Sequence, residues 1–526
     1  MRNFHFPGRS PVMAPSAMVS TSHPLATQAG IDVLKSGGNA VDAAIAACAT
    51  LCVVEPAMTG IGGDCFVLYS PYNSSKPIAL NGSGKSPAAA NVANLRDRGV
   101  EQIEGETPHA VNVPGAIAAW TRLNTDYGTK DLTELLRPAI HYAKNGFPVA
   151  PRVALDWVDN LPKLLSDEVS SKILTVSGEA PKAGTKFAQP LLGTTLAAIA
   201  KGGRDAFYTG EIAEDMVTRL NTLGGLHTLD DFASCVADYV EPISVSYKNH
   251  TINECPPNGQ GICALIILRI LSHYNMESLT EADRIHLLAE ATKLAYHQRD
   301  AYISDPSFNE IPVDWLLSDE HIGALQKQID MAKAKSYGPS DFPSHTDTTY
   351  LCCVDVDGNA ISFINSLFSG FGSGIMAAKT GILLQNRGSS FNLNPDHVNC
   401  IEGGKRPMHT IIPGMVTKDT KTIAPFGVMG GQYQSAGHAN FISNVLDLGL
   451  DVQQAMDQPR SFAINQQLQM EENFAPSIFA DLTNRGHQIE KLGKPLGGSQ
   501  CIWINHEEGV LIGGSEPRKD GCAMGY

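Results

Sequence analysis

The stretch HTDTTYLCCVDVDGNAISFINSLFSGFGSG, residues 345–374, predicts two buried strands joined by a tight turn. Asp357-Gly358 is a strong signal for a two-residue hairpin turn, and apolar runs flank it on both sides. The unusual feature is the Asp-Thr-Thr sequence at 347–349, where the first strand begins. Threonine favours strands, so propensity alone can explain it. The other explanation is that the chain is cut there, and the rest of the sequence has to decide between the two.

Helix and strand signals alternate on either side of this stretch. Residues 23–56 predict two helices separated by Gly37-Gly38, the second of them capped by Asn39. That second helix is apolar on nearly every side, so we expect it to be buried. Further on, the pattern predicts strands over 380–386 and 408–416 and a helix over 434–449. Many strands with helices before and between them indicate an α/β protein whose sheets lie buried between helices.

Composition and charge exclude several classes of function. The 526 residues are 43% hydrophobic and 18% charged, with a net charge of −15. Nucleic-acid binding requires a basic footprint, which this balance disfavours. The most apolar segment, residues 40–54, is too short to span a membrane, and the first residues lack the apolar core of a signal peptide. Eleven cysteines without a C-x-x-C pair indicate reduced core residues, and we expect a cytoplasmic protein.

Three ligand motifs are present only in part. The segment NGSGKSP resembles a phosphate loop but has Ala79 where its first glycine should be. The segment DVDGN resembles a calcium loop, whose twelfth position requires glutamate and here is serine. His286 and Glu290 lie four apart on one helix face, but no third ligand is near in sequence, which favours an ion-paired face over a metal site. The sequence therefore predicts no metal and no cofactor.

Thr348 is expected to act as a nucleophile only if the chain is cut before it. The sequence lacks the G-x-S-x-G motif of a serine hydrolase, and nothing adjacent to Thr348 supplies a base. An N-terminal threonine carries its own base, because an α-amino group has a pKa of about 8 and reaches its own Oγ. That chemistry requires cleavage of the Asp347–Thr348 bond. The polar stretch 326–347 would give the new chain ends room to separate.

Six segments, in order, resemble the γ-glutamyltransferase family of N-terminal-nucleophile hydrolases. They are SGGNAVDAAIAACATLCVVEPAMTGIGGDCF, VPGAIAAW, TTYLCCVDVDGNAISF, FGSGIMAAKTGILLQN, GKRPMHTIIP and SEPRKDGCAMGY. The resemblance implies a four-layer αββα sandwich and a proenzyme that cleaves itself between Asp347 and Thr348. It also implies a large subunit, 1–347, and a small subunit, 348–526, which together form one interwoven catalytic domain and a heterodimer.

The resemblance also implies roles for individual residues. Thr348 falls on the family's nucleophile, and Ser366 falls where a hydroxyl contacts that nucleophile. Gly430 and Gly431 fall on the paired glycines whose backbone N–H groups form the oxyanion hole, which requires donors preset for charge developing on the carbonyl oxygen.

The glutamate-binding residues of the family are replaced in this sequence. The arginine that holds the substrate carboxylate corresponds to Ser83, and a Ser-Ser pair beside it corresponds to His409-Thr410. The three residues that hold the α-amino group correspond to Phe368, Arg387 and Ser390. A cationic amine would meet an arginine and no carboxylate, whereas the planar fork of Arg387 suits a carboxylate. Pairing of Arg387 with a neighbouring acid remains the alternative.

We therefore predict a self-processing amidohydrolase for a small amide with an anionic group, of the kind that oxamate represents. One alternative is a true γ-glutamyl hydrolase or transferase that acts on glutathione or γ-glutamyl amides. A second is an uncut, non-catalytic binding protein of the same fold. The expected partners are a small-molecule substrate and the two subunits of the same chain, with further dimerisation open, and neither nucleic acid nor membrane.

Overall fold

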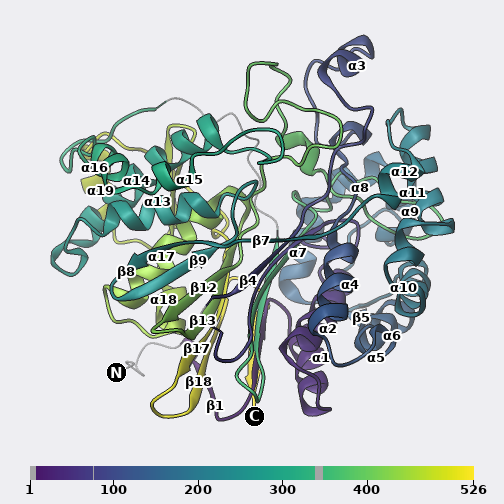
Figure 1. Ribbon diagram of the computed structural model, residues 1–526, viewed down its shortest axis with the longest axis horizontal. Helices are drawn as coiled ribbons and strands as arrows, with labels where there is room; N and C mark the ends of the chain where they lie inside the picture. The colour runs from purple at the N-terminus through teal and green to yellow at the C-terminus, as the bar shows by residue number, and fades with distance from the viewer. Residues whose placement is uncertain (1–7, 75, 338–347) are drawn as a thin grey trace.

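The computed structural model describes residues 8–74, 76–337 and 348–526. Two seven-stranded antiparallel sheets lie face to face at the centre, and helices cover the outer face of each (Figure 1). The predicted four-layer αββα sandwich is confirmed. The described chain contains no helix that is both long and apolar enough to cross a membrane.

Sheet I has the strand order β19-β2-β10-β11-β3-β4-β7, and sheet II has the order β1-β18-β17-β13-β12-β9-β8. The strands of sheet I are β19 Cys522–Gly525, β2 Met18–Thr21, β10 Thr349–Val354, β11 Ala360–Ser366, β3 Asp64–Ser70, β4 Ile78–Gly82 and β7 Asp238–Val240. Those of sheet II are β1 Val12–Ala14, β18 Val510–Ser515, β17 Gly498–Asn505, β13 Lys421–Met429, β12 Gly414–Lys418, β9 His250–Glu254 and β8 Ile243–Tyr247.

The helices divide between the two outer faces (Figure 1). Sheet I is covered by helices from the first half of the chain, chiefly α1 Pro24–Lys35, α2 Ala40–Val54, α4 Ala116–Tyr127, α6 Arg137–Asn145, α7 Pro151–Asp159, α10 Pro190–Tyr208 and α11 Glu211–Thr222. Sheet II is covered by α13 Gly261–Leu271, α14 Glu281–Tyr302, α16 Asp319–Gln326, α17 Gln434–Leu446 and α18 Val452–Asp457. A three-stranded sheet, β14 Ser461–Ile464, β15 Gln467–Met470 and β16 Gln488–Lys491, packs with α19 Pro476–Asn484 against α14.

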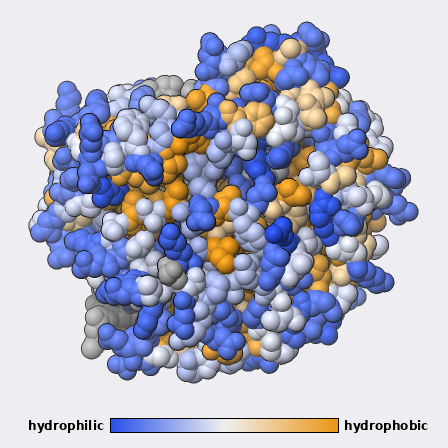
Figure 2. All heavy atoms as spheres, in the orientation of Figure 1, coloured by the Kyte–Doolittle hydropathy of each residue, from blue (hydrophilic) through white to orange (hydrophobic). Residues whose placement is uncertain are grey.

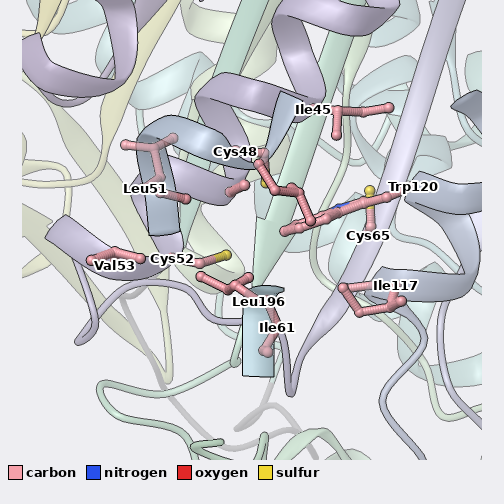
Figure 3. Packing of buried hydrophobic residues seen from close by; sticks show 14 of the residues in the cluster. Ile45, Cys48, Leu51, Cys52, Val53, Ile61, Cys65, Ile117, Trp120 and Leu196 are labelled. Atoms are coloured by element: carbon pink, nitrogen blue, oxygen red, sulfur yellow. The ribbon is translucent and has the colours of Figure 1, made fainter. Parts of the chain in front are cut away.

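Separate apolar cores hold the layers together. Between the sheets, alternate residues of the facing strands pack on one another, among them Phe66, Tyr350 and Ile502. Helix α2 is buried over its whole length, as predicted, and its N-terminus carries a capping box made by Asn39 and Asp42. Around it, the sulfurs of three cysteines lie among aliphatic side chains and Trp120 (Figure 3). All eleven cysteines are free, and ten of them are buried, which confirms them as core residues.

The hairpin around Asp357-Gly358 is confirmed, but its connection is longer than the predicted two residues, because residues 355–359 separate the paired Val354 and Ala360. Of two further predicted strands, 380–386 is wrong, and 408–416 is right only from Gly414, where β12 begins. β10 and β11 pair in register from Thr349 opposite Asn365 to Val354 opposite Ala360, and Gly358 takes a φ of +84° in the turn. Residues 380–386 and 408–413 form no strand and make only isolated bridges. Both segments are apolar and buried, which mimics a strand pattern, yet their backbone groups bond to loops. These irregular segments carry part of the candidate site.

The chain segments 1–347 and 348–526 interleave within both sheets. In sheet I, β2 lies between β19 and β10, and β11 pairs with β3. In sheet II, β1 pairs with β18 and β12 pairs with β9. Neither segment could therefore bury its core without the other.

The face of the molecule shown in Figure 2 is mostly hydrophilic, with hydrophobic residues in small groups.

Candidate active site

Thr348 lies at the edge of the central layer, immediately before β10. It is fully buried, and its Oγ1 is 3.2 Å from Oγ of Ser366, the last residue of β11. The hairpin register produces this approach, because Thr349 pairs with Asn365 and leaves the next two residues facing each other. The predicted contact between Thr348 and Ser366 is present. Asp347, the other half of the predicted processing site, lies outside the described residues.

Gln434 also contacts Thr348, and sequence reasoning did not single it out. Its Nε2 donates to Thr348 Oγ1 at 3.4 Å, and its Oε1 accepts from the N–H of Ile412 at 3.1 Å. The second bond fixes the amide so that its NH₂ group faces the threonine. Gln434 begins α17, directly after the glycine turn. The only signal in the sequence is its place in the polar run GGQYQS.

Gly430 and Gly431 form a sharp turn between β13 and α17. Their φ angles are +128° and +57°, a region that favours glycine. A Cβ on Gly430 would come within 2.8 Å of Gly497 Cα, so a larger residue would also clash. Gln260 Nε2 donates to the carbonyl of Gly431 at 3.1 Å, and the hydroxyl of Tyr296 donates to the carbonyl of Gln432. These hydrogen bonds fix the carbonyl groups of the turn in place.

Gln260 links this turn to the segment that carries Thr410. The same Nε2 donates to the carbonyl of Thr410 at 2.9 Å, and Gln260 Oε1 accepts from Arg299 Nη1 at 3.2 Å. Arg299 is fully buried on α14. Because one buried amide serves both segments, a shift of either would break a hydrogen bond in the interior, which costs about 1–3 kcal/mol. The site is therefore held rigidly from the sheet II side.

Arg387 is a fully buried cation with unused hydrogen-bond donors. Its Nη1 donates to Thr410 Oγ1 at 2.8 Å, but Nε and Nη2 have no partner among the described residues. The guanidinium carbon lies 3.9 Å from the ring centre of Phe368. Burial lowers the pKa of Arg387 to about 9, an effect that the charge of Asp64 partly opposes. The group is therefore still protonated at neutral pH.

Phe368 joins Arg387 to the threonine. Its backbone N–H donates to Ser366 Oγ at 2.9 Å, and Ser366 in turn contacts Thr348. Phe368 has a φ of +84°, which is unfavourable for a side chain of this size. Strain of this kind is retained where the surrounding structure enforces it, often at functional sites. These four residues thus form a continuous chain of contacts from the hydroxyl of Thr348 to the guanidinium of Arg387.

Asp64 and His409 form a buried pair beside the arginine. Asp64 Oδ2 accepts from His409 Nε2 at 3.0 Å, while its Oδ1 accepts from Gln385 Nε2 and from the N–H groups of Gly84 and Gly115. His409 Nδ1 accepts from the N–H of Ile411 at 3.3 Å. Burial, with help from the charge of Arg387, lowers the pKa of His409 to about 4, so the imidazole is neutral. Both ring nitrogens of His409 already take part in hydrogen bonds.

Ser83 and Ser390 differ in how their hydroxyls are used. Ser83 Oγ donates to Asn81 Oδ1 at 2.8 Å and accepts from Asn258 Nδ2 at 3.2 Å. The hydroxyl of Ser390, which follows Arg387 in the same turn of 3-10 helix, is buried and lacks a partner among the described residues. Ser83 is therefore part of the scaffold, while Ser390 and Arg387 both have polar atoms still to be satisfied.

A groove of about 750 Å³ adjoins these residues. It is lined by residues 101–105 on one side and, on the other, by Ser369, Asn386, Ser389 and residues 391–394. Ser369 follows Phe368 in sequence, and Asn386 and Ser389 flank Arg387 and Ser390. The groove is thus lined by chain neighbours of the candidate site residues.

Known proteins share both the sequence and this architecture. The gamma-glutamyltranspeptidase family matches residues 26–526. The chain is 37% identical over 524 residues to the glutathione hydrolase-like YwrD proenzyme of Bacillus subtilis, covering 98% of this chain and 99% of that protein. It is 34% identical over 525 residues to the oxamate amidohydrolase proenzyme of Klebsiella pneumoniae, covering 97% and 98%.

A solved structure, the cephalosporin acylase from Bacillus halodurans, superposes with a TM-score of 0.94 at 39% identity and covers 100% of this chain and 99% of that one. The sandwich of two sheets and the match over nearly the whole length lead to the same conclusion about the family. The chain belongs to the gamma-glutamyltranspeptidase family, and it is an amide hydrolase of the N-terminal-nucleophile type.

Proposed function

We propose that this enzyme cleaves itself before Thr348 and then hydrolyses a small amide that carries a carboxylate near the scissile bond, as oxamate does. The observation that carries the substrate class is Arg387, a buried guanidinium with two unpaired donors that is connected to Thr348 through Phe368 and Ser366. Burying a cation without an anion is costly, and a substrate carboxylate would supply the missing partner. A bidentate contact to Nε and Nη2 would suit the geometry of both groups.

The proposed reaction uses the new N-terminus as its base. The α-amine of Thr348 takes the hydroxyl proton while Oγ1 bonds to the amide carbon. Backbone N–H groups of Gly430 and Gly431 stabilise the oxyanion. The C–N bond then breaks, the amine returns the proton to the leaving nitrogen, and an ester to Thr348 remains. Water, deprotonated by the same amine, cleaves that ester and restores the hydroxyl.

The other predicted residues take supporting roles in this proposal. Ser366 and Gln434 orient the hydroxyl of Thr348 through the contacts described above. Thr410 and Phe368 position Arg387, while His409 stays neutral and hydrogen-bonds to Asp64. Ser390 offers its buried hydroxyl to the substrate, and Ser83 supports the wall of the pocket. Eleven free cysteines support a reducing compartment, in agreement with the cytoplasm expected from the sequence.

A second candidate is an acylase that acts on a larger amide. The groove of about 750 Å³ beside Ser369, Asn386 and Ser389 favours it, because oxamate alone would leave that volume unused. In this version, Arg387 still binds a carboxylate of the acyl group, and the groove holds the remainder of the molecule.

Two measurements test the proposal. Mass spectrometry of the purified protein should find a fragment that begins at Thr348, and Thr348→Ala should stay one chain without activity. A small fragment with another N-terminus would refute the assignment of the nucleophile, and an uncut, inactive wild type would favour a binding protein.

The second measurement compares kcat/KM for oxamate, a glutaryl amide and glutathione on one preparation. We expect both anionic amides to exceed glutathione. Arg387→Ala should remove that preference, while Arg96→Ala, which removes an exposed cation at the groove, should keep it. If glutathione is the best substrate and Arg387→Ala has no effect on it, this protein recognises glutamate through other residues.

A further inference from the structure

Sequence alone favoured an ion-paired face for His286 and Glu290, because no third ligand lies near them in the chain. The structure brings His487 to the same place from a distance of 201 residues. One ligand atom of each residue lies within 4.8 Å of the other two, and all three residues are buried. Glu290 does pair with Lys293, so the ion-paired face also exists.

We propose that His286, Glu290 and His487 bind one Zn²⁺ ion. Two imidazoles and a carboxylate form a ligand set that zinc accepts in tetrahedral sites, with a water molecule as the fourth ligand. The site lies where α14 meets the β14–β16 sheet, whereas Thr348 immediately precedes β10 of sheet I. The metal would therefore fasten this small sheet to the helix and take no part in amide hydrolysis.

The surroundings of His286 present one nitrogen for coordination. Its Nε2 lies 2.9 Å from the carbonyl oxygen of Asp330, which can only accept, so Nε2 carries the proton. The unprotonated Nδ1 therefore points to His487 Nε2, at 2.8 Å. A carbonyl on the outer nitrogen is the arrangement that orients histidine ligands in metal sites.

Metal binding needs local rearrangements of the three side chains. A tetrahedral ion with Zn–N bonds of about 2.0–2.1 Å separates two nitrogens by about 3.3 Å, so the rings move apart by about 0.5 Å. The proton on His487 moves from Nε2 to Nδ1, and both imidazoles stay neutral. Lys293 releases Glu290 Oε1, now at 2.6 Å, and keeps its bond to the carbonyl of Lys335 at 2.9 Å.

Access and a source of water are both present. A cavity of about 140 Å³ is lined by His487, Lys293 and residues 334–337, and His297 also borders it. The cavity is large enough to hold the water that completes the coordination. Glu290 Oε2 accepts from the N–H of Lys335 at 3.2 Å, which leaves lone pairs for a metal. The site therefore has ligands, outer hydrogen bonds and an approach from solvent.

The site also joins the two chain segments of the proposed processing. His286 and Glu290 belong to residues 1–347, and His487 belongs to residues 348–526. Only this bridging consequence rests on the proposed self-cleavage, because the ligands already meet in the uncut chain. Thr348→Ala should bind the metal as the wild type does, which separates failure of the metal site from failure of the proposed function.

The test is a Zn²⁺ titration of full-length, chelator-treated protein by calorimetry, with metal analysis after gel filtration. We expect one Zn²⁺ per chain in the wild type and none in His487→Gln or Glu290→Gln. The matched control is His297→Gln, an exposed histidine on the same helix that borders the same cavity, and it should keep the metal. Binding that survives in His487→Gln or disappears in His297→Gln would overturn the proposal.

Cobalt provides a measurement that does not depend on the variants. Co²⁺ in a tetrahedral site with nitrogen ligands absorbs strongly in the visible range, whereas an octahedral, adventitious ion absorbs weakly. We expect the wild type to show the strong bands with one equivalent of Co²⁺ and to lose them when Zn²⁺ is added. Weak bands only, or none, would refute the site even if every variant failed to fold.

Discussion

The charges of Arg460 and Arg518, which are buried and half-buried, are met differently from the charge of the fully buried Arg387. Arg460 and Arg518 share the carboxylates of Glu471 and Glu516, at 2.5 Å for Arg460 to Glu516 and 2.7 Å for Arg518 to Glu471. Burial raises the pKa of Glu516, but the two arginines outweigh it and hold that pKa below its usual value. Arg387 has no carboxylate partner among the described ion pairs, and two of its donors are unused.

Under the proposed function, the difference separates a structural cation from one that binds the substrate. A network in which each charge has a partner is complete in the folded protein and has nothing to offer a substrate. An isolated buried guanidinium is a cost in the empty enzyme, and a bound anion removes it. Replacing an arginine is therefore expected to lower stability where the arginine is paired with carboxylates, and to lower activity where it is isolated.

The largest expected effect is on stability, at the complete network. Arg518→Ala should lower the free energy of unfolding by about 3–5 kcal/mol, because it leaves two buried carboxylates with one cation. Urea unfolding followed by circular dichroism measures this loss. Arg518→Lys, which keeps the charge, is the matched control and should lose less. An unchanged unfolding midpoint in Arg518→Ala would mean that the network is not structural.

The next effect is on activity, at the isolated arginine. Arg387→Met should lower kcat/KM for a small anionic amide by roughly thirty-fold or more, since losing a buried charged contact costs about 2–5 kcal/mol. Its free energy of unfolding should stay the same or rise, because an uncompensated buried charge is gone. Steady-state kinetics and urea unfolding of one preparation test both parts. A variant that is unstable yet fully active would reverse the comparison.

A bound anion should raise the melting temperature only when Arg387 is present. Oxalate, the dicarboxylate that hydrolysis of oxamate leaves, should raise the melting temperature of the wild type, and at a hundred times its Kd it should contribute about 2.7 kcal/mol. The shift should vanish in Arg387→Met and persist in Arg96→Ala. Differential scanning fluorimetry with chloride at equal ionic strength controls for salt. Equal stabilisation by chloride would show that the site does not select a carboxylate.

The smallest effect is a change in pH dependence. The pKa of His409 falls from 6.5 to about 4 through burial and the charge of Arg387. Between those values the unfolded chain binds a proton that the folded chain does not, so stability decreases as pH falls from about 6.5 to about 4. Removing Arg387 raises the folded-state pKa and makes the decrease smaller, by about 1.4 kcal/mol for each unit regained.

Urea midpoints at pH 7 and pH 5 test this in the wild type and in Arg387→Met. Other buried histidines, such as His227, whose pKa burial lowers to about 4, contribute equally in both proteins and cancel. A steeper decrease in Arg387→Met would contradict the expectation.

Local signals predicted much of the fold. The Asn39 cap, the Asp357-Gly358 turn and the apolar run of α2 each act within a few residues, so they could be read from sequence. Residues 380–386 and 408–413 were wrongly predicted as strands for the same reason. Their apolar pattern is local, whereas their pairing depends on loops that only the folded chain brings near.

The candidate site was predicted less completely than the fold. The contact of Thr348 with Ser366 follows from the hairpin, and the family resemblance identified both residues. Gln434 and Asp64 were missed because each acts on a residue far away in the chain. His487 could not be foreseen at all, since nothing near position 487 points to position 286. Long-range pairing of polar groups leaves no periodic trace in a single sequence.

The interleaved strands constrain the order of events in making this enzyme. Because β10 lies between β2 and β11, the cleavage proposed before Thr348 would follow the pairing of strands from both segments. Under the proposed self-cleavage, β19 would have to pair with β2 before sheet I is complete and cutting begins. A ribosome that stalls before codon 522 would release a chain that lacks an edge strand of that sheet. If the chain matures by the proposed cleavage, cutting would report that strands from both segments have already paired.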